Sequence, residues 1–152
     1  MIRITVPQTG QAALCRPIFA LLPTWFGRLE ANQHYLDYID ANPTYIAYAD
    51  KQAVGFMALA HHYPHAVEIY VMAVHPEHHR RGIGRELVEA AERDLRAGGT
   101  RFLQVKTLGE AHPDAGYALT RQFYMGIGFI PLEEHEDYWG AGTPALQLIK
   151  TL

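Results

Sequence analysis

The sequence has a single cysteine and no long uninterrupted apolar run. Cys15 cannot form an internal disulfide, and no Cys/His spacing of zinc-finger type accompanies it, so we expect a buried thiol in a reducing compartment, the cytoplasm. No window approaches the roughly 18 apolar residues of a membrane span. The opening Met1–Val6 alternates like a strand and does not resemble a secretion signal. We therefore predict no membrane association.

Positive charge is also scarce. The formal net charge is -3 at pH 7, and the isoelectric point is near 6.3. Without a general basic face the chain has no obvious surface for nucleic acid, and any anion site must be local. The length of 152 residues fits one domain, residues 1–152. We expect a small partner and no nucleic acid.

Hydrophobic periodicity predicts alternating strands and helices. The run Val67–Val74 is apolar apart from Glu68 and Tyr70, which indicates a strand buried on both faces and helices covering both sides of a sheet. A strand–helix–strand unit around Gly82 requires its two strands to be parallel. The expected elements are a strand at 2–6, helices near 14–22 and 28–40, strands at 45–48, 54–59 and 67–74, a helix from 83 to about 97, a strand at 101–107, a helix at 117–127, and strands at 129–132 and 145–150.

The loop His79–Gly84 carries the clearest chemical signal, because it leads from a buried strand into a helix. The first N–H groups of a helix have no intrahelical partner and favour anions. Gly82 and Gly84 let a phosphate approach the backbone, and Arg80 and Arg81 add positive charge. The alternative to an anion site is that the two glycines only allow the chain to turn and that the arginines are solvated. A Rossmann fingerprint and a P-loop are both excluded, since their glycine patterns are missing.

This loop, which follows Val74-His75-Pro76-Glu77, resembles the coenzyme A signature R/Q-x-x-G-x-G/A of the GNAT N-acetyltransferases. Thr120–Phe129 resembles the later Phe-Tyr-x-x-x-Gly-Phe block of that superfamily. The resemblance implies an α/β (α+β) fold whose mixed, mostly antiparallel sheet of about seven strands has helices on both faces, and acetyl-CoA as co-substrate. It implies coenzyme contacts from the following residues: Met72, Ala73, Val74, His79, Arg80, Arg81, Gly82, Ile83, Gly84 and Tyr117. His79 stands where relatives have Arg or Gln, and Tyr117 where many have Asn.

Two residues are candidates for acid–base chemistry in acetyl transfer to an amine. Tyr124 matches the position that the superfamily uses to protonate the leaving thiolate, and a phenol is protonated at neutral pH. Glu68 is the only ionisable carboxyl in its apolar strand and could accept the proton of the amine through water. The alternatives are that Tyr124 is a core aromatic, and that Glu68 and Tyr70 form pocket walls or a structural pair.

The acceptor amine is not identified by the sequence. The resemblance places its site between the first two helices and the last strands, which nominates Trp25, Phe26, Tyr70 and Tyr138, the last within the acidic and aromatic stretch 133–139. Such groups would suit a cationic amine on a small molecule or peptide, although a solvated loop is an alternative. His61, His62 and His65 lack the additional ligands of a metal site, and we expect none. A coenzyme-binding regulatory module, a longer acyl donor and a homodimer all stay open.

Overall fold

The computed structural model describes residues 1–22, 29–112 and 114–152. A seven-stranded sheet in the order β1-β2-β3-β4-β5-β7-β6 forms its centre. Among the strand pairs of the described residues only β4–β5 is parallel, which confirms the predicted mixed sheet. The elements are β1 (Ile2–Ile4), α1 (Ala12–Ala20), α3 (Leu29–Ala41), β2 (Thr44–Ala49), β3 (Gln52–Tyr63), β4 (Ala66–Val74), the 3-10 turn Pro76–His78, α4 (Ile83–Ala97), β5 (Phe102–Leu108), α5 (Ala115–Gly126), β6 (Ile130–His135) and β7 (Ala145–Thr151).

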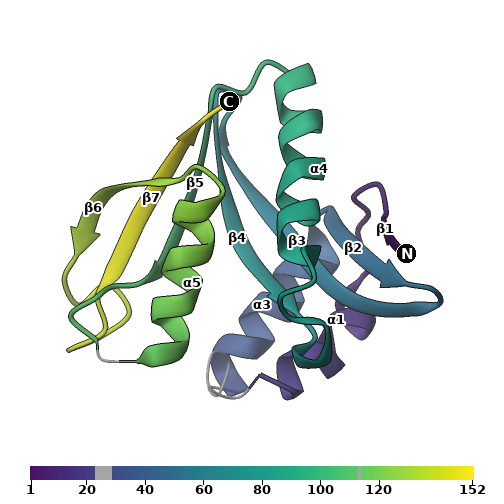
Figure 1. Ribbon diagram of the computed structural model, residues 1–152, viewed down its shortest axis with the longest axis horizontal. Coiled ribbons are helices and arrows are strands. Elements are labelled where there is room, and N and C mark those ends of the chain that lie inside the picture. The colour runs from purple at the N-terminus through teal and green to yellow at the C-terminus, as the bar shows by residue number, and fades with distance from the viewer. Residues whose placement is uncertain (23–28, 113) are drawn as a thin grey trace.

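Helices cover both faces of the sheet: α1 and α3 lie behind β2 to β4, whereas α4 and α5 lie in front (Figure 1). The periodicity of the first helix was only partly informative. Ile18 is buried as expected, but Leu14 and Leu21 are 37% and 48% exposed, and the helix instead buries Ala12 and Cys15. No helix in the described part of the chain is long and apolar enough to span a membrane.

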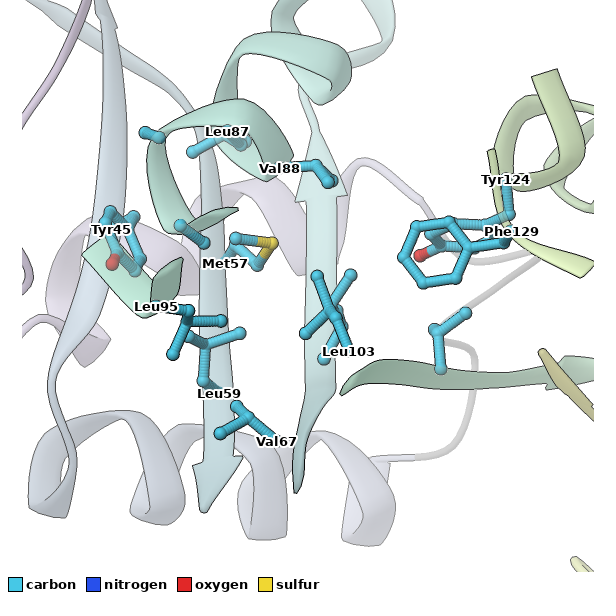
Figure 2. Close-up of a cluster of buried hydrophobic side chains, with 14 of the residues drawn as sticks. Tyr45, Met57, Leu59, Val67, Leu87, Val88, Leu95, Leu103, Tyr124 and Phe129 are labelled. Carbon is cyan, nitrogen blue, oxygen red and sulfur yellow. The ribbon is translucent and has the colours of Figure 1, made fainter. Parts of the chain in front are cut away.

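The packing of α4 on the sheet confirms the apolar stripe read from its sequence. Leu87 and Val88 point from α4 toward Met57 of β3 and Leu103 of β5 (Figure 2). Burying such side chains contributes about 1.5–3 kcal/mol each. The end of α5 adds Tyr124 to the same core, which therefore holds the two front helices in fixed positions on the sheet.

The strands β4 and β5 run together only at their beginnings. Their parallel pairing joins Ala66–Ile69 to Phe102–Val105 and then stops. A register shift in the β3–β4 ladder leaves Tyr70 as an extra residue between Ile69 and Val71, so the strand bends there. Past this point β4 and β5 diverge (Figure 1), and β5 continues its pairing with β7 alone. Within the described residues, the backbone of 70–74 thus has no partner strand on the β5 side.

Candidate active site

A cavity of about 1100 Å³ opens where β4 and β5 separate. Gly82 and Gly84 at the start of α4 line one end of it, and Tyr35 of α3 lines the other. Because α4 and α3 cover opposite faces of the sheet, the cavity crosses the sheet plane at the gap between the two strands. We call these parts the α4 end and the α3 end.

The α4 end is shaped by two left-handed backbone positions. Arg80 has φ 61° and Gly82, the N-cap of α4, has φ 80°. Gly82 has no side chain to cap this helix, and no described side chain caps it, so its first N–H groups lack a side-chain acceptor at the edge of the cavity. The ring of His79 donates a hydrogen bond from Nε2 to the carbonyl oxygen of Val74 at 2.7 Å, which ties the loop to the end of β4. This geometry is that of an anion site at a helix start.

Positive side chains and a close helix contact complete the α4 end. Arg80 and Arg85 line the cavity, while Arg81 is exposed and does not line it. A Cβ on Gly84 would lie 3.0 Å from Cζ of Phe123 in α5. Gly84 therefore leaves room for the Phe123 ring against the start of α4, a packing role that the phosphate argument alone did not predict.

Residues expected to contact the pantetheine arm lie along the middle of the cavity. Met72, Ala73 and Val74 line it on the open side of β4, and Ile83 adds a buried wall. Tyr117 also lines the cavity, and burial raises its pKa to about 12. Met72, Ala73, Val74 and Tyr117 therefore line the same cavity as the start of α4.

Tyr124 of α5 lines the cavity. Its side chain is only 5% exposed, and its ring meets those of Phe123 and Phe129 edge-on at centroid distances of 5.1 and 5.5 Å. Burial raises the pKa of its phenol above the ordinary tyrosine range, so the hydroxyl carries its proton at neutral pH. Two aromatic neighbours fix the ring in place.

Glu68 is buried in a three-residue ion cluster and does not itself line the cavity. Its Oε1 accepts a hydrogen bond from Nε2 of His62 at 2.7 Å, and its Oε2 contacts Nζ of Lys106 at 2.9 Å. Lys106 does line the cavity. Lys106 therefore links the cavity lining to the buried Glu68 carboxylate.

Aromatic side chains dominate the α3 end. Tyr70 lines the cavity, with its ring 5.6 Å from that of Tyr35 and 4.1 Å from that of Tyr38. Trp139 lines it as well, and Tyr138 packs against Trp139 at 5.3 Å without being part of the lining. Trp25 and Phe26, two of the predicted acceptor contacts, lie outside the described residues.

The acidic residues of 133–137 do not reach the cavity. Glu133 belongs to β6, which extends to His135, three residues beyond its predicted end. The carboxylate of Asp137 accepts a hydrogen bond from the backbone N–H of Gly142 at 2.7 Å and stabilises the β6–β7 turn. Of the acidic and aromatic stretch expected to meet the acceptor, only Trp139 lines the cavity.

Comparison with known proteins places this architecture. The family model described as "Acetyltransferase (GNAT) family" matches residues 15–129, which is most of the chain. The chain belongs to the GNAT acetyltransferase family. Acetyl transfer from acetyl-CoA is therefore its general reaction. No curated protein sequence matches it.

Several solved structures have the same fold as this GNAT chain. A GNAT-family protein from Desulfovibrio desulfuricans superimposes with a TM-score of 0.86 at 21% identity over 99% of both chains. A GNAT acetyltransferase from Elizabethkingia anophelis, solved with acetyl-CoA bound, gives 0.74 and 21% over 99% of this chain and 98% of its own. The aminoglycoside 6'-N-acetyltransferase from Enterococcus faecium gives 0.75 and 16% over 98% and 96%. These likenesses confirm the predicted GNAT fold.

Sequence reasoning missed several side chains that line the GNAT cavity. The most consequential is Lys106, because it is the cation nearest to the predicted base. A signal for it existed: Glu68 and Lys106 are charged positions in neighbouring parallel strands, and the strand register would have brought them together. Also missed were Asn32, Tyr35, Thr107 and His112.

No metal site is evident in this GNAT domain. Within the described residues, no group of three or more His, Cys, Asp or Glu side chains is arranged to hold a metal ion. Of the three histidines near the start of β4, His62 bonds to Glu68 and His65 stacks on Tyr63 at 5.3 Å. Ordinary hydrogen bonding and ring stacking thus account for both of these side chains.

Proposed function

We propose that this chain transfers the acetyl group of acetyl-CoA directly to a primary amine of a small molecule or peptide. One observation carries the proposal: a single cavity joins the anion site at the start of α4, the hydroxyl-bearing Tyr124 and an aromatic acceptor end. Such a cavity brings two substrates together across the sheet. A binding module without turnover would need only the α4 end.

The α4 end fits the coenzyme by the chemistry of its donors. Uncapped N–H groups at the start of α4, together with Arg80 and Arg85, suit the charges of a diphosphate. Acetyl-CoA supplies the acetyl thioester when it is bound. The open edge of residues 70–74 offers backbone groups to the pantetheine amides and to the thioester oxygen. This part of the cavity is the support for coenzyme A as co-substrate.

In this proposal Tyr124 donates its phenolic proton to the leaving thiolate. The raised pKa of Tyr124 keeps the proton on the phenol until the sulfur atom gains negative charge. The same water-poor surroundings also disfavour the charged thiolate. The proton affinities of the phenol and of the leaving thiol therefore differ less in the site than their pKa values in water suggest. The cluster around Glu68 supports the opposite step: Glu68 takes a proton from the amine through water, and the half-exposed His62 connects it to solvent.

The test is a thiol-release assay with acetyl-CoA and a panel of primary amines. For Tyr124→Phe we expect kcat to fall by about 100-fold or more, since general acid catalysis contributes about 10²–10⁴, with the Kd for coenzyme A unchanged within about threefold. Because the pKa of Tyr124 is raised, its deprotonation should cause no loss of wild-type activity between pH 7 and 10. Glu68→Gln should lower the rate most at the acidic end of that range, where fewer amines are neutral.

Two results would contradict the proposal. If coenzyme A binds but no amine releases thiol, even at high enzyme concentration, the chain is a coenzyme-binding module. If Tyr124→Phe retains wild-type kcat, Tyr124 is a core aromatic and another group supplies the proton. Propionyl-CoA and succinyl-CoA in the same assay rank the longer acyl donors, which the α4 end does not discriminate because it holds the far end of the coenzyme.

A further inference from the structure

We propose that the acceptor is a monoamine with a flat aromatic body, and that Lys106 excludes amines that carry a second positive charge. The inference rests on the proposed acetyl transfer and names the substrate class of the same site. It depends on two features of the cavity that the general reaction does not require: partly exposed aromatic side chains, and a fixed ammonium group that lines the same cavity.

The aromatic faces are available and held in place. Tyr70 and Trp139 both line the cavity, yet 39% and 37% of their surfaces remain exposed. The ring of Tyr70 is held by Tyr35 and Tyr38 of α3, and the hydroxyl of Tyr38 donates a 2.6 Å hydrogen bond to the carbonyl oxygen of Leu59. Rigid aromatic faces that border a cavity bind flat aromatic groups, and also cations, with little loss of conformational entropy.

The charged side chains near the cavity favour an acceptor with an uncharged aromatic body over one with a cationic body. Nζ of Lys106 is fixed 2.9 Å from Glu68 and lies 5.6 Å from the ring centroid of Tyr138, so one aromatic face near the cavity already holds a cation. Among the described side chains, the only carboxylate that lines the cavity is Asp114. Its Oδ1 accepts a hydrogen bond at 3.1 Å from the backbone N–H of Tyr117 and caps α5.

A diamine or an aminoglycoside would therefore bring its second ammonium group into a cavity that Lys106 lines, and no unengaged carboxylate is found among the described side chains of its lining. Repulsion of this kind is a common source of specificity. An uncharged aromatic body meets no such repulsion and can pack against Tyr70 and Trp139. Lys106 thus acts as a specificity determinant, and the aromatic walls supply the affinity.

The experiment compares three amines: 2-phenylethylamine, pentylamine and 1,5-diaminopentane. We expect kcat/KM for thiol release to fall in that order, with phenylethylamine at least tenfold above the diamine. Lys106→Met leaves Glu68 without its ammonium partner beside the cavity, so the phenylethylamine/diamine ratio should fall at least tenfold. Lys106→Arg keeps the charge and should keep the ratio within about threefold, and thermal melting of each variant confirms that it is folded.

Dissociation constants of the same amines, measured by calorimetry with coenzyme A present, separate this inference from the proposed function. If phenylethylamine binds more tightly than the other two amines but no thiol is released, the result contradicts the proposed catalysis and supports the inferred class of amine. Equal or tighter binding of the diamine to the wild-type protein would overturn the inference, whether or not turnover occurs. A ratio that does not change in folded Lys106→Met would remove Lys106 as the determinant.

Discussion

The two ends of the cavity differ in the groups that form them: backbone groups at the α4 end and separate side chains at the α3 end. The α4 end consists largely of consecutive residues, 79–85, and acts through backbone N–H groups at a helix start. The α3 end is assembled from single side chains of α3, β4, β5 and the β6–β7 loop, which lie far apart in the chain. Backbone geometry tolerates many side-chain changes, whereas a wall of side chains can change its chemistry with one substitution. A family can therefore keep one coenzyme and vary the acceptor.

The largest effect that would separate the two ends is expected from Gly84→Val. A Cβ at this position lies 3.0 Å from Cζ of Phe123, so the Phe123 ring or the start of α4 must shift to admit the valine. Overpacking of this kind costs about 1–3 kcal/mol, and we expect the Kd for coenzyme A to rise by about 10- to 100-fold because the helix start moves. The relative preference among amines should stay the same. Calorimetry and the three-amine assay measure both quantities.

The control for this prediction is a double-mutant cycle with Phe123→Leu. The smaller side chain makes room for the valine, so the double variant should recover part of the lost affinity and of the thermal stability. Strictly additive effects would show that the contact between Gly84 and Phe123 is not what limits substitution at this position.

The contrast between the two ends also explains what could be predicted from the sequence. The loop 79–84 was identifiable because a strand, a glycine pair and an amphipathic helix follow one another locally, and the positions of Tyr124 and Tyr117 in the next block came from the family resemblance. Lys106 was missed because its place at the cavity depends on the β4–β5 register. Trp139 was named only as part of the stretch 133–139, because its separation from the rest of that stretch depends on the extension of β6 to His135. Gly84 was assigned to phosphate binding, since its contact with Phe123 depends on how two helices pack.

Gly82→Ala should have a smaller effect at the α4 end. Nothing lies within 4 Å of a Cβ built on Gly82, so its cost is conformational: φ is +80°, where an L-residue loses about 1–2 kcal/mol. We expect a roughly fivefold to tenfold weaker Kd for coenzyme A and a small drop in melting temperature. Gly98→Ala, at the other end of α4 with φ -86°, is the matched control and should leave coenzyme affinity unchanged. Equal losses in both variants would point to general destabilisation and not to the shape of the loop.

The smallest effect belongs to the α3 end, where Tyr38→Phe removes only the hydroxyl that bonds to the Leu59 carbonyl oxygen. A lost hydrogen bond of this type costs about 0.5–1.5 kcal/mol of stability, and the freer ring of residue 38 should hold Tyr70 less firmly. We expect KM for phenylethylamine to rise about threefold, with no change in the Kd for coenzyme A.

Tyr63→Phe is the control for this prediction. Tyr63 is 64% exposed at the β3–β4 turn, so its substitution should change neither value. If Tyr38→Phe weakened coenzyme binding as much as acceptor binding, the two ends could not be treated as independent, because a change behind β4 would then reach the start of α4 through the sheet.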